Sequence, residues 1–242
     1  MSLLAAGPIA GPVQLVRAAH PLQAVLTAVV VACVATAAGR PLREVGLVAA
    51  TVLVGQVVLG WVNDLVDCGR DAARARVHKP LASGTLEPGT VWYAAACGVL
   101  LVVPLALANG RAAGAAYLLS VAVAALGTSL MRVRGSALSW LPWAASAGLL
   151  PAFVTYGGWG GASEGDPPTI VVTVLAALLG VTAHVLLSLP DLVADNEDGQ
   201  RHLPLRVALR TGAPRLLWIG VAVAVFLVAS LLVAGATTGL HQ

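Results

Sequence analysis

Long apolar runs alternate with short polar connections along this chain. Seven runs can be followed, at residues 21–39, 45–62, 90–108, 113–130, 137–156, 169–189 and 214–236. Each run is continuous and about 20 residues long, the length that a helix needs to cross the hydrocarbon core of a bilayer. Only helices and closed barrels satisfy their backbone polar groups in lipid, and runs without alternation argue against a barrel. The pattern predicts an all-α fold: a polytopic membrane bundle of about seven transmembrane helices, forming a single domain over residues 1–242.

The composition supports a membrane protein. Of the 242 residues, 58% are hydrophobic and 10% are charged, whereas soluble domains average roughly 25% charged residues. So few charges could not cover the surface of a soluble fold, and the apolar content excludes disorder. The formal net charge of +3 does not indicate nucleic-acid binding, because the basic residues lie in short connections between apolar runs. The three Cys are scattered and predict neither a disulfide framework nor a metal cluster.

The distribution of basic residues predicts an orientation. The side of the membrane that holds the N-terminus receives 11 Lys and Arg residues, and the other side receives 3. By the positive-inside rule, the N-terminus is cytoplasmic. The first twenty residues lack a basic region before their apolar stretch, so we expect no cleaved signal peptide. Prolines break this region into pieces, which predicts a short interfacial segment. The bias toward Ala, Gly, Val and Arg is typical of a GC-rich genome, so we expect an integral protein of a bacterial plasma membrane.

Most of the charge falls in two connections on the predicted cytoplasmic side, residues 63–89 and 190–213. In the first, Asn63, Asp67 and Asp71 are spaced i, i+4, i+8 and would form one stripe on a helix. In the second, Asp191 and Asp195 would share a helical face at the end of the sixth span. The alternative is that both are ordinary solvated loops, which their shared face and shared spacing disfavour.

Oxygen ligands in this arrangement favour Mg²⁺. Two facing acidic stripes repel each other unless cations lie between them. Mg²⁺ usually binds one or two carboxylates together with substrate phosphates. The two segments therefore predict a diphosphate held through Mg²⁺. Nearby basic side chains could clamp the phosphate groups, or could serve only to set the topology; they are Arg70, Arg74, Arg76, Lys79 and Arg132.

The two segments resemble the signatures of the UbiA superfamily of intramembrane prenyltransferases. The sequence NDLVDCGRD at 63–71, followed by KPLASG at 79–84, is similar to NDxxDxxxD and RPLxSG. The sequence DLVADNEDGQRHLPL at 191–205 is similar to DxxxDxxxGxxTLP. The motifs cover a small part of the chain, but their positions after the second and sixth spans extend the similarity over most of it.

The resemblance implies that an isoprenyl group moves from a prenyl diphosphate to an acceptor, which the sequence does not identify. It implies Mg²⁺ held by Asn63, Asp67, Asp71, Asp191 and Asp195, of which the four aspartates are the candidate catalytic residues. The candidate substrate-binding residues are Asn63, Arg74, Lys79 and Arg132. The prenyl chain would lie in an apolar cavity open to the lipid bilayer, where the exclusion of water protects a carbocation.

The sequence departs from the family pattern in several places. Lys79 stands where Arg is usual, His202 replaces Thr, and residues 128–132 stand where the family often has a Tyr and a Lys. Family members usually have nine helices, two more than expected here. Two missing helices would leave one side of the bundle open, which a homo-oligomer or a partner subunit would close.

Three alternative functions remain open from the sequence. An intramembrane terpene cyclase would act on the prenyl diphosphate without an acceptor. A phosphoribosyltransferase would use polyprenyl phosphate as the acceptor. A small transporter is the least favoured, because it would carry polar or broken helices at the bilayer midplane, whereas the carboxylates here cluster toward one surface.

Overall fold

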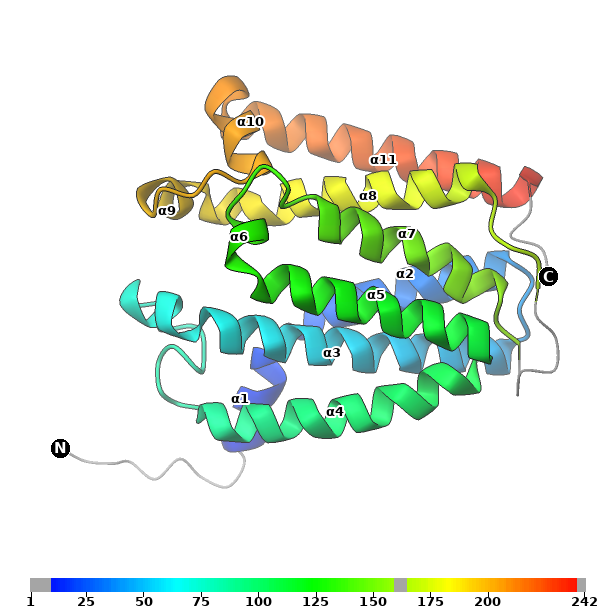
Figure 1. Cartoon of the computed structure of the whole chain (residues 1–242), viewed down its shortest axis with the longest axis horizontal. Helices are drawn as coiled ribbons and strands as arrows, with labels where there is room; N and C mark the ends of the chain where they lie inside the picture. The colour runs from blue at the N-terminus through cyan, green and yellow to red at the C-terminus, as the bar shows by residue number, and fades with distance from the viewer. Residues whose placement is uncertain (1–9, 159–164, 239–242) are drawn as a thin grey trace.

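The computed structural model describes residues 10–158 and 165–238, and every regular element within these ranges is helical (Figure 1). The seven apolar runs correspond to α2 (Pro21–Ala37), α3 (Leu42–Ala73), α4 (Pro88–Ala108), α5 (Arg111–Ser129), α7 (Leu141–Thr155), α8 (Ile170–Ser188) and α11 (Ala213–Thr238). The shorter elements are α1 (Ala10–Ala18), α6 (Met131–Arg134), the 3-10 turn η2 (Leu189–Asp191), α9 (Leu192–Glu197) and α10 (Leu203–Thr211). The prediction of an all-α membrane bundle is confirmed.

The helices differ in how well they fit a membrane. Among the described residues, five helices are long and apolar enough to cross one: α3, α4, α5, α11, and α8 continued through α9. The pair α1–α2 would form a sixth span, bent by 55°. Helix α7 is apolar but has only 15 residues. Within the described ranges, five or six of the seven expected spans are therefore supported by length and composition, and α7 is too short to be counted with them.

Consecutive long helices pack against one another and place small residues at their crossings. The closest neighbours include α2 with α3, α5 with α7, and α7 with α8. A Cβ on Gly180 of α8 would lie 2.4 Å from the Trp143 carbonyl oxygen of α7, so the two backbones approach as only glycine allows. The rings of Tyr117 and Phe153 pack with their centroids 4.7 Å apart, and the Tyr117 hydroxyl donates to the Val52 carbonyl at 3.2 Å. These contacts join α3, α5 and α7 in one core.

The outer faces of the bundle are apolar. Leu100 on α4 and Phe226 on α11 are 75% and 68% exposed, and many other large apolar side chains lie on the outside. Soluble monomers rarely expose apolar surface on this scale. Together with the spans, it defines an integral membrane protein whose outer helices face lipid.

Helix α1 lies beside the C-terminal part of α3. The Trp61 indole donates to the Leu15 carbonyl at 2.9 Å. A Cβ on Gly60 would lie 2.5 Å from the Ala19 carbonyl oxygen, so the absence of a side chain lets the α1–α2 junction touch α3. Pro21 begins α2, where its missing N–H leaves no hydrogen bond unmade. The short segment expected before the first span is therefore a helix fixed against α3.

The two acidic segments lie at the same end of the bundle (Figure 1). Helix α3 continues to Ala73, beyond the expected end of its span at residue 62, so the first segment occupies its last turns. Helix α8 ends at Ser188, and Pro190 lies in the η2 turn that leads into α9. The second segment is thus not one continuous helix with α8. Helices α6 and α10 complete this end, which we call the motif end.

Candidate active site

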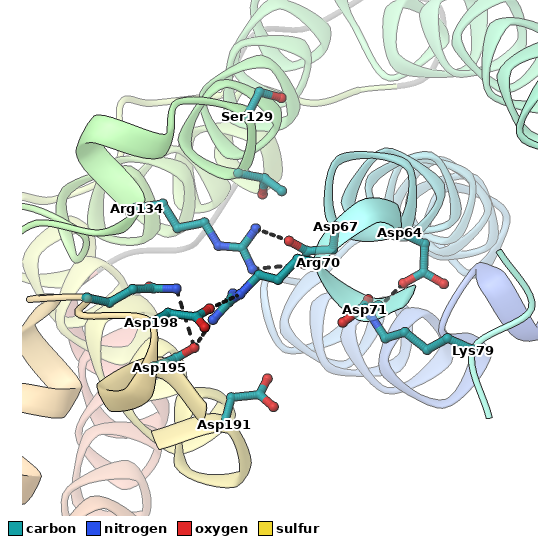
Figure 2. Close-up of polar contacts among 12 residues, drawn as sticks. Asp64, Asp67, Arg70, Asp71, Lys79, Ser129, Arg134, Asp191, Asp195 and Asp198 are labelled. Atoms are coloured by element: carbon teal, nitrogen blue, oxygen red, sulfur yellow. Dashed lines mark hydrogen bonds and ion pairs between the residues drawn. The ribbon is translucent and has the colours of Figure 1, made fainter. Parts of the chain in front are cut away.

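Arg70 joins the two acidic segments (Figure 2). It projects from α3 and forms an ion pair with Asp195 of α9, and its Nε donates to Asp198 Oδ2 at 2.8 Å. Asp195 is buried and Asp198 is exposed. Arg70 and Asp195 are separated by 125 positions in the sequence, so the bundle brings together the two segments that the sequence singled out.

Two further arginines that follow α3 reach the second segment. Arg74 forms an ion pair with Asp198 and also donates to the Ala194 carbonyl. Arg76 pairs with Asp191, and its Nη1 lies 3.4 Å from Asp71 Oδ1. The two acidic stripes are therefore held together by guanidinium groups, which supply the cations that facing carboxylates require.

Asp67 is bound by an arginine that the sequence interpretation did not select. Arg134, at the end of α6, donates from Nη1 to Asp67 Oδ1 at 2.5 Å and from Nη2 to Asp67 Oδ2 at 2.8 Å (Figure 2). A bidentate pair of this kind fixes both the position and the orientation of the Asp67 carboxylate. The sequence signal was present but weak: Arg134 follows the candidate Arg132 by two positions on the same predicted side.

Lys79 bridges two carboxylates of α3. Its Nζ lies 2.9 Å from Asp64 Oδ1 and 2.8 Å from Asp71 Oδ2. The His20 imidazole approaches the same Asp64 oxygen at 3.0 Å. Asp64 is 2% exposed and was not among the predicted ligands. Asn63, the predicted ligand next to it in the sequence, is half-buried. At the start of this motif, the contacts with Lys79 and His20 are therefore made by Asp64.

His202 fills the position where the family pattern has Thr. Its Nδ1 accepts a hydrogen bond from the Leu205 amide at 3.2 Å, which caps the N-terminus of α10. Because Nδ1 accepts, the proton lies on Nε2, which donates to Asp195 Oδ2 at 2.9 Å. The imidazole therefore binds one oxygen of the Asp195 carboxylate, and Arg70 pairs with the other.

The ion pairs shift the pKa values of groups in the connecting segments. Burial lowers the pKa of Lys79, but hydrogen bonds from Nζ to Asp71 and Asp64 outweigh this effect and raise it. Hydrogen bonds from Arg74 and Arg70 lower the pKa of Asp198. Lys79 and Asp198 therefore both remain ionised at neutral pH.

The donor set fits Mg²⁺ when substrate oxygens complete the coordination. Within the described part of the chain, no three His, Cys, Asp or Glu side chains are close enough together to hold a metal ion by themselves. The carboxylates instead lie in two groups facing each other across the arginines. Mg²⁺ generally takes one or two carboxylates and keeps water or phosphate oxygens as its other ligands, so such a distribution suits a metal that arrives with a diphosphate.

The structure brings most of the predicted site residues together. Asp67, Asp71, Asp191 and Asp195 are joined at the motif end through basic side chains, and Arg74 and Lys79 take part in the same network. Asn63 lies on α3 beside this network. Arg132 belongs to α6, and its side chain lies outside what the structure describes.

A membrane bundle with two facing acidic segments at one end defines a class of intramembrane enzyme. The model of the UbiA prenyltransferase family matches residues 24–241, and the chain belongs to this family. A search of curated proteins found no match to the sequence. The resemblance stated from the two motifs is confirmed.

Solved structures share the fold of this chain at low sequence identity. A UbiA homolog from Archaeoglobus fulgidus, bound to GPP and Mg²⁺, is 17% identical with a TM-score of 0.68, covering 90% of this chain and 77% of its own. The same homolog bound to DMAPP and Mg²⁺ is 19% identical with a TM-score of 0.67, over the same shares of the two chains. A structure concerned with digeranylgeranylglyceryl phosphate synthase is 15% identical with a TM-score of 0.58, covering 92% and 77%.

Proposed function

We propose that this protein transfers an isoprenyl group from a prenyl diphosphate to an acceptor within the membrane, with Mg²⁺ as the cofactor. The observation that carries the proposal is the Arg70–Asp195 ion pair, which holds the two acidic segments of the family at one site. The similar structures bound to GPP or DMAPP with Mg²⁺ support the same donor and metal for this chain.

In this proposal, the metal ligands are Asn63, Asp67 and Asp71 on α3, with Asp191 and Asp195 on the η2–α9 segment. Mg²⁺ bound there would stabilise the negative charge that develops on the departing diphosphate. The protein's own part is to release carboxylates from their present partners. Each of the four aspartates is paired with an arginine or lysine.

The same basic side chains are the proposed diphosphate ligands. Arg74, Lys79 and Arg132 were selected from the sequence, which also named Arg70 as a possible clamp. The contact of Arg70 with Asp195 supports including it, and Arg134 joins the set on the basis of its contact with Asp67. When the carboxylates turn to the metal, these cations become free to donate to phosphate oxygens. Substrate and metal thus replace the ion pairs together, and no charge is left without a partner.

The membrane supplies the apolar environment for the prenyl chain. The apolar helices next to the motif end keep water from a carbocation at the reacting carbon. On the distribution of basic residues, we place the motif end and the N-terminus in the cytoplasm of a bacterial cell. Closure of the bundle by a second copy of the chain is part of the proposal and is tested by the oligomeric state in nanodiscs.

The test is diphosphate release by purified protein in nanodiscs, with a panel of prenyl diphosphates and Mg²⁺. Asp67→Asn and Asp195→Asn are expected to abolish release while the protein stays folded. Glu197→Gln is the matched control, because Glu197 is exposed on α9 two residues from Asp195. Near-full turnover in either aspartate variant would contradict the two-segment mechanism.

The products separate the alternatives. A prenylated acceptor identified by mass spectrometry supports the transferase, whereas a cyclic hydrocarbon or alcohol formed without an acceptor supports a terpene cyclase. Turnover only with phosphoribosyl diphosphate and polyprenyl phosphate supports the phosphoribosyltransferase. Substrate movement across liposomes without metal would support the transporter.

A further inference from the structure

A polar cavity lies between α1, α3 and the segment after α3. It has a volume of about 320 Å³ and is lined by Arg17, His20, Pro21, Asp64, His78, Lys79 and Pro80. We call it the Arg17 cavity. Figure 2 shows Lys79 and Arg134 on different sides of α3, so the cavity lies away from the Asp67–Arg134 pair. It shares Lys79, which also contacts Asp71, with the candidate active site.

The Arg17 cavity contains a guanidinium group that pairs with no carboxylate among the described residues. Arg17 is exposed, and its two hydrogen bonds within the described chain go to neutral oxygens, the His78 carbonyl at 3.2 Å and Gln14 Oε1 at 3.4 Å. Asp64 is the one carboxylate in the lining, and it is already engaged by Lys79 and His20. The guanidinium of Arg17 is therefore available to an anion.

Donors enter the cavity from three segments. Arg17 comes from α1, His20 from the α1–α2 junction, and His78 and Lys79 from the segment after α3. A phosphate monoester carries about −1.5 to −2 charges at neutral pH and presents three acceptor oxygens. Its charge and number of acceptors match this set better than a carboxylate with a single charge.

The backbone is strained at His20, in the lining of the cavity. In the described chain, His20 and Ala75 are the two non-glycine residues with positive φ, at 51° and 50°. His20 lines the cavity, and Ala75 precedes His78 by three positions. Such conformations cost about 1–3 kcal/mol and persist where the surroundings hold them. At His20 this conformation accompanies the contact of the imidazole with Asp64.

Helix α1 presents an apolar and a cationic surface next to the cavity. Val13 and Val16 are about half exposed and lie on the same short helix as Arg17. Apolar side chains together with Arg are typical of helices that lie at the membrane interface. The Arg17 cavity is therefore placed where either a lipid headgroup or a dissolved compound can reach it.

We propose that the Arg17 cavity binds a phosphate monoester group, with Arg17, His78 and Lys79 donating to its oxygens. The group comes either from a membrane lipid or from a free phosphate compound. Lys79 is shared with the proposed diphosphate site, whereas Arg17 and His78 are not. Binding at the Arg17 cavity can be measured without a prenyl diphosphate or Mg²⁺, so its failure is distinguishable from a failure of the proposed prenyl transfer.

The experiment measures binding to the purified protein in phosphate-free maltoside detergent by isothermal titration calorimetry. The probes are inorganic phosphate, short-chain phosphatidic acid, which is a monoester, and short-chain phosphatidylcholine, which is a diester. Wild type is expected to bind at least one of the first two and not the third. Arg17→Gln and His78→Gln are each expected to weaken binding by about tenfold or more, the loss of one hydrogen bond to a charged group.

Arg111→Gln is the matched control, because Arg111 is exposed at the start of α5, at the end of the bundle opposite the motif end. Its affinity is expected to equal that of wild type, and melting temperatures check that all variants are folded. Binding of inorganic phosphate as tight as that of phosphatidic acid assigns the site to free phosphate compounds. Binding of phosphatidic acid alone assigns it to a lipid. The absence of binding by both probes, or an unchanged affinity in Arg17→Gln, would overturn the proposal.

Discussion

Arg134 of α6 donates from both terminal guanidinium nitrogens to the two carboxylate oxygens of Asp67 of α3, at 2.5 and 2.8 Å. This contact joins the short helix after α5 to the first acidic segment. It places a cation next to a proposed metal ligand, at a position that the sequence interpretation passed over.

The first prediction concerns this pair. Arg134→Gln is expected to lower diphosphate release by about tenfold or more, because one hydrogen bond to a charged group contributes about 1.5–3 kcal/mol. Arg134→Lys should recover only part of the rate, because an ammonium group cannot bind in a bidentate manner. Single-turnover assays in nanodiscs measure both. Arg210→Gln, an exposed change on α10 at the motif end, serves as the control. Equal rates for Arg134→Gln and wild type would remove Arg134 from the site.

The second prediction concerns ligand binding and stability. Mg²⁺ alone should raise the melting temperature little, because each of the four proposed aspartate ligands already has a basic partner. Mg²⁺ with an unreactive prenyl diphosphate analogue should raise it clearly, since a ligand at 100 times its Kd stabilises the folded state by about 2.7 kcal/mol. Thermal unfolding with and without EDTA measures the difference. If Mg²⁺ alone raised the melting temperature as much as Mg²⁺ with the analogue, the proposal that metal and substrate replace the ion pairs together would be contradicted.

The third prediction concerns the contact between the α1–α2 junction and α3. Gly60→Ala would bring a Cβ to 2.5 Å from the Ala19 carbonyl oxygen and should lower the free energy of unfolding by about 1–3 kcal/mol. Gly69→Ala, on the same helix, meets nothing within 4 Å and should be neutral or stabilising by about 0.5–1 kcal/mol. Thermal melting in detergent compares them. Similar melting temperatures would mean that the junction can move away at little cost.

The fourth prediction concerns acid stability. Because Arg74 and Arg70 lower the pKa of folded Asp198 below its ordinary value of 3.8, its contribution is present above that pH. The contribution is lost as the pH falls through the lowered pKa. Wild type should therefore lose stability below about pH 4, and Asp198→Asn should show a shallower decline. Unfolding in detergent at a series of pH values measures the slopes. Glu197→Gln should keep the wild-type slope.

The fifth prediction concerns orientation. In a variant with its three Cys replaced, Val77→Cys at the motif end should be protected from a membrane-impermeant maleimide in intact cells and labelled in inverted vesicles. Arg111→Cys, at the opposite end, should show the reverse. Val77 is 80% exposed, so access of the reagent is not limited by packing. Labelling of position 77 from outside the cell would reverse the topology predicted from the basic residues.

The fold could be predicted because long hydrophobic runs indicate helices that are surrounded by lipid. All seven expected spans are helical, and the two acidic segments lie at one end. The helix boundaries were less predictable. Helix α3 runs through its acidic segment to Ala73, because polar residues in a helix lower its hydropathy without ending it. Pro190 interrupts the helix before Asp195, so the expected continuous face is divided between a 3-10 turn and α9.

The partners of the site residues could not be predicted from spacing. Asp67 pairs with Arg134 and Asp195 with Arg70, and each pair depends on how distant helices cross. The stripe of Asn63, Asp67 and Asp71 follows from helical geometry, but burial of Asp64 requires Lys79 and His20 to reach it from other segments. Local sequence specifies which face a residue lies on, whereas the crossing of helices decides which charge it meets.

Helix α7 has 15 residues and therefore rises about 22 Å, whereas the hydrocarbon core is about 30 Å thick. A helix shorter than the hydrocarbon core is accommodated by local thinning of the bilayer, by snorkelling of flanking side chains or by oligomerisation. Helix α7 packs between α5 and α8, whose following segments carry Arg134 and Asp195. A local depression of the membrane surface at this position would lower the charged end of a prenyl diphosphate to the depth of the site, while its tail remained in lipid.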